Sequence, residues 1–88
     1  MKLKDSIIIT SVDDYYVLVD TSLSNDRFNG VVKLNETGKV MCDFLKEDIN
    51  FNELMKRMNG VYNGDYKEIE NDVRNTLNKL KDIDLIID

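Results

Sequence analysis

The spacing of hydrophobic and polar residues changes near Asn35, from the alternation of a strand to the periodicity of a helix. Alternate residues up to Leu34 face one side of an extended segment, which is typical of a half-buried strand. Beyond Asn35, apolar residues recur at helical spacing, at Val40, Met41, Phe44 and Leu45. Asn35 is a favourable N-cap and Glu36 complements the helix dipole. We therefore expect a strand over 28–34 and a helix over 36–46.

Two more strands are expected before this corner. Residues 6–12 (SIIITSV) and 15–19 (YYVLV) are short runs rich in β-branched and aromatic residues. Asp13 and Asp14 separate them as a tight turn, which predicts an antiparallel hairpin. The polar segment 20–27 is interpreted as the loop that leads to the third strand.

Two more helices are expected after the corner. Asn50 and Glu53 form a capping-box pattern for a helix over 51–59, and Gly60 is placed to end that helix in a left-handed conformation. Asp65 and Glu68 repeat the pattern before a helix over 66–82. The apolar stripe of this last helix is Tyr66, Ile69, Val73, Leu77 and Leu80. Val61 and Tyr62 are expected to fill the core, and the apolar tail 85–87 to add a strand or cover the core.

The order of elements, three strands followed by three helices, predicts an α+β fold. The first two helices, joined by a short turn, form a helix-turn-helix-like pair, so the prediction is a winged-helix-like domain with a three-stranded antiparallel sheet. Eighty-eight residues, of which 42% are hydrophobic and 33% charged, are expected to form one globular domain over 1–88.

Charge and cysteine content narrow the class of function. A net charge of −5 argues against nucleic acid as a partner, because phosphate binding relies on clustered Lys and Arg. The chain has one cysteine, Cys42, and shows no signal peptide and no apolar run of membrane-spanning length, so we expect a cytoplasmic protein without a membrane partner.

The sequence offers little catalytic chemistry. Histidine is absent, Cys42 has no histidine partner, and there is no calcium-loop, paired-carboxylate or phosphate-binding glycine motif. We therefore expect no enzyme activity, no metal and no cofactor. Cys42 is interpreted as a packing residue, with a redox or catalytic role as the alternative. Met55 and Met58 are interpreted as core residues rather than as a soft binding surface.

The remaining candidates are surfaces. If the third strand lies at a sheet edge, it offers N–H and C=O groups to an incoming extended peptide. On the last helix, Glu70, Arg74, Leu77 and Lys81 form a strip beside the core stripe. This strip is either a solvated face, with Glu70 and Arg74 as an ordinary pair, or a surface that holds side chains of a bound peptide.

The segment 29–38 (NGVVKLNETG) resembles the strand, L-N-x-T-G and helix signature of PqqD-like proteins. Weaker matches follow in helical segments and at Leu85-Ile86, so the resemblance extends over about 18–86. Two departures are Ile83-Asp84-Leu85, where many members have a glycine before the final aliphatic pair, and Cys42, where members often have a bulky apolar or aromatic residue.

The resemblance implies a non-catalytic recognition element for a ribosomally made precursor peptide. Such a domain binds the leader segment as an extra strand, in the groove beside the third helix, and presents the peptide to a modifying enzyme, often a radical SAM protein. The peptide-binding positions that the family implies here are Val31, Val32, Lys33, Leu34, Val73, Arg74, Leu77 and Lys81.

Two other readings stay open. A winged-helix DNA-binding or transcription-related module would use residues 51–59 as its recognition helix, which contains only Lys56 and Arg57 as basic residues. A structural subunit that dimerises through its edge strand also fits the pattern. The expected oligomeric state is a monomer or a weak homodimer.

Overall fold

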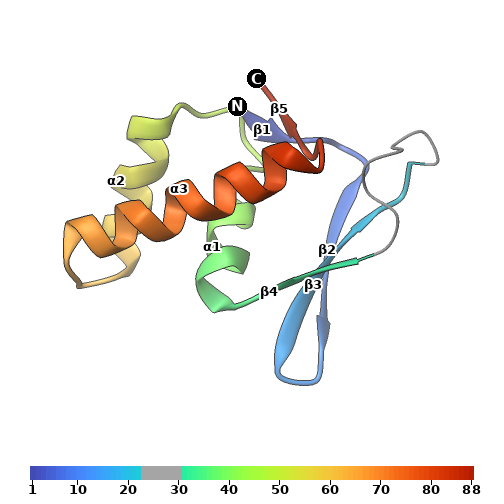
Figure 1. The fold of residues 1–88 in the computed structure, drawn as a ribbon, viewed down its shortest axis with the longest axis horizontal. Helices are drawn as coiled ribbons and strands as arrows, with labels where there is room; N and C mark the ends of the chain where they lie inside the picture. The colour runs from blue at the N-terminus through green and yellow to red at the C-terminus, as the bar shows by residue number, and fades with distance from the viewer. Residues whose placement is uncertain (23–30) are drawn as a thin grey trace.

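The computed structural model describes residues 1–22 and 31–88 (Figure 1). Strands β2 (Ile7–Val12), β3 (Tyr15–Asp20) and β4 (Val31–Leu34) precede helices α1 (Glu36–Phe44), α2 (Phe51–Val61) and α3 (Tyr66–Asp82). The α+β prediction of three strands followed by three helices is confirmed. Residues 28–30, which the sequence assigns to the third strand, lie outside the described residues.

The three strands form one antiparallel sheet in the order β2-β3-β4. Asp13 and Asp14 connect β2 to β3 as predicted, and Asp13 has a positive φ of 52°, a conformation that Asp tolerates better than most residues. Ile9 pairs with Leu18, which pairs with Val32. The sheet extends to one side of the helices as the wing of the domain (Figure 1).

Asparagine and aspartate side chains begin all three helices. Asn35 accepts a hydrogen bond from the Gly38 N–H, and Asn50 accepts one from the Glu53 N–H, each over 2.8 Å. Both N-caps agree with the sequence prediction. Asp65 accepts from the Lys67 N–H, rather than from Glu68 as a capping box requires.

A second, two-stranded sheet joins the two ends of the described chain. Strand β1 (Lys2–Leu3) pairs antiparallel with β5 (Ile86–Ile87), and the backbone N–H of Leu3 also donates to the Leu45 carbonyl over 2.8 Å. The sequence leaves open whether the apolar tail adds a strand or covers the core, and both occur, since Ile86 and Ile87 form β5 and Leu85 is buried. The sequence does not predict β1, because two residues carry no periodicity and their partner is at the other end of the sequence.

The core lies between the helix-facing side of the sheet and the three helices. It includes Leu18, Leu34, Met41, Leu54, Met55, Met58, Val73, Leu77 and Leu80. The core assignment of Met55 and Met58 is confirmed, since 2% and 0% of these residues are exposed. In the described part of the chain, no helix is both long and apolar enough to cross a membrane.

Several sequence predictions of where helices end and of which residues are buried are wrong. Helix α2 runs through Gly60 to Val61, because Gly60 keeps a helical conformation and does not end the helix. Val61 is 52% exposed, so it does not fill the core, and Tyr66 is 53% exposed, so it lies outside the apolar stripe of α3. The first helix ends at Phe44, two residues earlier than predicted.

Candidate functional site

Strand β4 forms one edge of the three-stranded sheet, as its candidate role requires. The hydrogen bond from the Thr21 N–H to the Ser6 carbonyl, over 2.8 Å, fixes which residues of β3 bond to β2. Because hydrogen-bonded and non-bonded pairs alternate in antiparallel sheets, the remaining residues of β3 bond to Val32 and Leu34 of β4. Val31 and Lys33 therefore direct their N–H and C=O groups outward, where an added strand would bind.

The side chains of β4 lie on two different faces. Leu34 is 6% exposed and packs into the core below the sheet. Lys33 lies on the opposite face, with its Nζ 4.4 Å from the centre of the Tyr15 ring. A peptide strand beside β4 would therefore place alternate side chains toward the helices and toward Lys33.

The turn from β4 into α1 is closely packed. A Cβ atom added to Gly38 would lie 3.2 Å from Leu34 Cδ2 and 3.3 Å from Asn35 Oδ1, the atom that caps the helix. The glycine in this motif is thus explained by close approach to strand and cap rather than by a left-handed backbone. This packing fixes the angle between β4 and α1.

Helix α3 forms the other wall beside β4. A cavity of about 110 Å³ is lined by Lys33, Leu34, Asn35, Gly38, Thr76, Lys79 and Leu80. A wider and more open depression of about 430 Å³ continues along the end of β4, lined by Asp14, Tyr15, Lys33, Leu34, Asn35 and Glu36. We call the strand edge and these two hollows the β4 groove. Its floor is apolar at Leu34 and Leu80, and its rim carries charges of both signs.

The helix residues predicted from sequence do not line this groove. Arg74, Leu77 and Lys81 line a different cavity of about 230 Å³, together with Met1, Phe51 and Asn78. Two residues along a helix correspond to about 200° of rotation, so Arg74 and Thr76 lie on nearly opposite flanks of α3. The structure therefore brings Lys33 and Leu34 close to Thr76 and Lys79, and places the predicted strip beside α2.

Contacts on that other flank hold the strip in place. The Arg74 guanidinium lies 4.3 Å from the centre of the Phe51 ring and 3.5 Å from a Glu70 carboxylate oxygen. Val73 is completely buried and is a core residue. Thr76, Lys79 and Leu80, which line the cavity beside β4, are not among the peptide-binding positions predicted from the sequence. Their positions are consistent with one helical flank, but the sequence does not indicate which flank faces the strand.

The surface of α2 is less basic than its sequence suggests. Arg57 forms ion pairs with Glu47 and Glu53, and hydrogen bonds to these carboxylates raise its pKa above the usual value. These pairs occupy the Nε and one terminal nitrogen of Arg57, which leaves fewer of its donors for phosphate or base contacts. Of the two basic residues of α2, Lys56 alone forms no ion pair with a described residue. The DNA-binding alternative would therefore depend mainly on Lys56.

In the described part of the chain, the nucleophilic and metal-binding side chains do not gather into a reactive cluster. Cys42 is fully buried, and this burial raises the pKa of its thiol from 9.0 to about 12. Since the thiolate is the reactive form, Cys42 fits the packing role better than a catalytic one. Within residues 1–22 and 31–88, no three His, Cys, Asp or Glu side chains gather in a way that could hold a metal ion.

Comparisons with known proteins identify a family and a shared fold. The model of the family described as Coenzyme PQQ synthesis protein D (PqqD) matches residues 14–86, which is most of the chain. Among solved structures, the chain is similar to TbiB1 in complex with the TbiA(beta) leader peptide, with a TM-score of 0.72, 23% identity and coverage of 100% of both chains. A search of curated proteins found no match. At this level of identity, the structural similarity shows a shared fold.

Proposed function

The chain belongs to the PqqD family, and on this premise we propose that it is a recognition element without catalytic activity of its own. It binds the leader segment of a ribosomally synthesised precursor peptide by strand addition to β4. It then presents the rest of the peptide to a modifying enzyme in the cytoplasm, for which a radical SAM protein is our first candidate.

The observation that carries this proposal is the open edge of β4 beside α3. An extended peptide gains main-chain hydrogen bonds from Val31 and Lys33, and side-chain contacts from the flanking groove. The cavity next to β4 has a volume of about 110 Å³, which is room for one side chain of the peptide rather than for a small-molecule substrate. TbiB1, which shares the fold, was solved with a leader peptide.

Within this proposal the binding residues are those of the β4 groove. Val31, Val32, Lys33 and Leu34 supply the strand, and Thr76, Lys79 and Leu80 supply the helix. Arg74, Leu77 and Lys81, which the family resemblance implies, lie on the other flank of α3. The two sets make different predictions, so mutations on the two flanks can separate them.

The first test is a titration of the labelled protein with the leader half of the co-encoded precursor peptide, followed by amide NMR. We expect chemical shift changes concentrated at 31–34 and 76–80. Unchanged spectra at near-millimolar peptide, with changes in α2 on addition of duplex DNA, would overturn the proposal and favour the winged-helix alternative.

A matched pair of variants then locates the groove. Thr76→Trp fills the cavity beside β4, whereas Asn78→Trp adds the same ring to the opposite flank of α3. We expect T76W to weaken leader binding by about tenfold or more, which is roughly 1.4 kcal/mol, and N78W to leave it within about twofold. Calorimetry measures both affinities. The reverse result would move the peptide to the flank of Arg74 and Lys81.

A further inference from the structure

Strand β2 is the second edge of the sheet, and it lacks the features that normally protect an edge. Its six residues, IIITSV, include no charge and no proline, and the structure shows no bulge in its pairing with β3. Soluble proteins usually place Lys, Pro or a covering element at an edge strand, because open N–H and C=O groups invite pairing. In residues 1–22 and 31–88, no strand pairs with β2 on its outer side.

The register shows which backbone groups of β2 are open. Ile8, Thr10 and Val12 form the hydrogen-bonded pairs with β3, by the same alternation that applies to β4. Ile9 and Ser11 therefore direct their N–H and C=O groups away from the sheet. Ile7 has a different role, because its N–H donates to the Lys4 carbonyl over 3.1 Å.

The outward N–H and C=O groups of β2 are complementary to the same groups in a second copy of the chain. If two copies of β2 lie antiparallel with Thr10 on a two-fold axis, Ile9 of one copy faces Ser11 of the other, and both pairs can exchange two hydrogen bonds. The same register puts Ile8 opposite Val12 of the second copy. Ile8 and Val12 are 51% and 36% exposed, and they are the exposed large hydrophobic residues of the described sheet.

We propose that two copies of this chain associate through β2, with Thr10 on the two-fold axis, to form a continuous six-stranded sheet. Ile8 and Val12 pack across the new interface on the outer face, and Thr10 faces its own copy there. Cross-strand pairs of this kind, aliphatic with aliphatic and Thr with Thr, are favourable.

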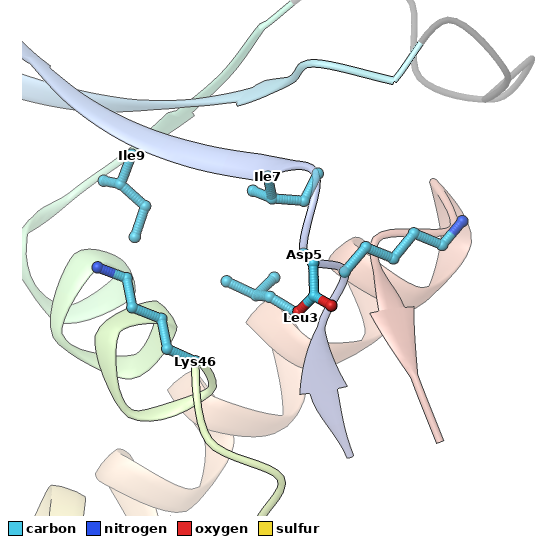
Figure 2. Close-up of a pocket in the computed structure, with 6 residues that line it drawn as sticks. Leu3, Asp5, Ile7, Ile9 and Lys46 are labelled. Atoms are coloured by element: carbon cyan, nitrogen blue, oxygen red, sulfur yellow. The ribbon is translucent and has the colours of Figure 1, made fainter.

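The helix-facing side of β2 leaves room for the second copy. Ile7 and Ile9 point from β2 toward α1, with Lys46 on the far side of the hollow (Figure 2). This hollow has a volume of about 210 Å³, and a neighbouring one of about 370 Å³ is lined by Ile9, Thr10, Ser11, Tyr16, Lys39, Asp43 and Lys46. Ile9 and Ser11 of the second copy would cover these openings.

The association leaves β4 free at both outer edges of the sheet, so it is independent of leader binding. One strand pair is a small interface compared with those of stable complexes, and each copy carries a net charge of −5, which salt screens in part. We therefore expect a weak dimer that forms only at high protein concentration.

Sedimentation equilibrium tests this proposal on the full chain from micromolar to near-millimolar concentration. The variants place a positive or a negative charge at Thr10, the residue on the two-fold axis. Thr10 is exposed, so Thr10→Lys and Thr10→Glu are expected to fold normally, which circular dichroism checks. Each variant alone places like charges opposite each other and should be monomeric. An equimolar mixture of T10K and T10E should associate at least as strongly as the wild type.

The same two substitutions at Asn75, an exposed position of α3, are the control and should leave the wild-type dimer unchanged. Ser11→Pro removes an outward N–H and should weaken the dimer without breaking the pairing with β3. A wild type that stays monomeric at near-millimolar concentration would overturn the proposal. A dimer that T10K and T10E do not disturb, or that the leader peptide dissociates, would overturn it too, and the latter result would indicate pairing through β4.

Discussion

At the scale of single residues, Cys42 makes the stability of the domain depend on pH. Burial raises the pKa of the folded thiol from 9.0 to about 12, so between these values the unfolded chain loses a proton that the folded chain keeps. Stability is therefore retained below pH 9 and falls above it, by about 1.4 kcal/mol per pH unit from this group. Urea unfolding at pH 8 and pH 10 measures this change.

Cys42→Ala supplies the control for this pH dependence. Every other side chain is common to both proteins, so the difference between the two slopes isolates the thiol. We expect a shallower decline in the variant. Equal slopes in the two proteins would show that the thiol is not held protonated by burial.

Residue patterns predicted burial well where a helix had a continuous apolar stripe. Ile69, Val73, Leu77 and Leu80 are buried as expected, because successive turns reinforce one another. Tyr66 starts the same stripe but stays exposed, since it lies in the first turn of α3, beyond the packed part of the helix. Periodicity gives the direction of a side chain but not how far the neighbouring element extends.

At the scale of elements, the contributions of the β4 backbone and of its side chains to peptide binding can be tested separately. Lys33→Pro removes an outward N–H while the hydrogen bonds from Val32 and Leu34 to β3 remain, and edge strands tolerate proline at such positions. We expect K33P to fold and to lose about tenfold or more in leader affinity, which is roughly 1.4 kcal/mol for a lost main-chain hydrogen bond.

Lys33→Ala is the matched variant, because it removes the charge and the contact with Tyr15 but keeps the N–H. Strand addition predicts that K33P weakens binding more than K33A does. Calorimetric titration of the leader peptide compares the two. A larger loss in K33A would mean that the lysine side chain, rather than the strand edge, holds the peptide.

The elements themselves could largely be predicted from sequence. The boundaries of α3 and the caps at Asn35 and Asn50 follow from local signals. The identity of the α3 flank that faces β4 does not follow from local signals. It depends on how the helix is rotated in the core and on the angle of the turn at Gly38, which are tertiary properties. For this reason the family resemblance implies helix residues that the structure places beside α2, and the peptide-binding positions on both elements stay predictions.

At the scale of the whole molecule, the small sheet of β1 and β5 joins the start of the described chain to its end (Figure 1). Leu3 of this sheet is buried in the core, with 4% of the residue exposed, and it also lines the hollow below β2. The pairing of β1 with β5 joins residues that are farther apart in the sequence than those of any other strand pair in the described residues. Contacts of such long range cost the most loop entropy, so we expect them to form late in folding.

Leu3→Ala tests this role. Truncating a buried leucine typically costs about 2–5 kcal/mol, which is a large part of the stability of a small domain and lowers the melting temperature by roughly 8–40 °C. Ile87→Ala, in the same sheet but 44% exposed, should cost much less. If the sheet forms late, L3A speeds unfolding and leaves the folding rate nearly unchanged. Stopped-flow kinetics in urea measure both rates, and a slower folding rate in L3A would instead place the β1–β5 contact in the folding nucleus.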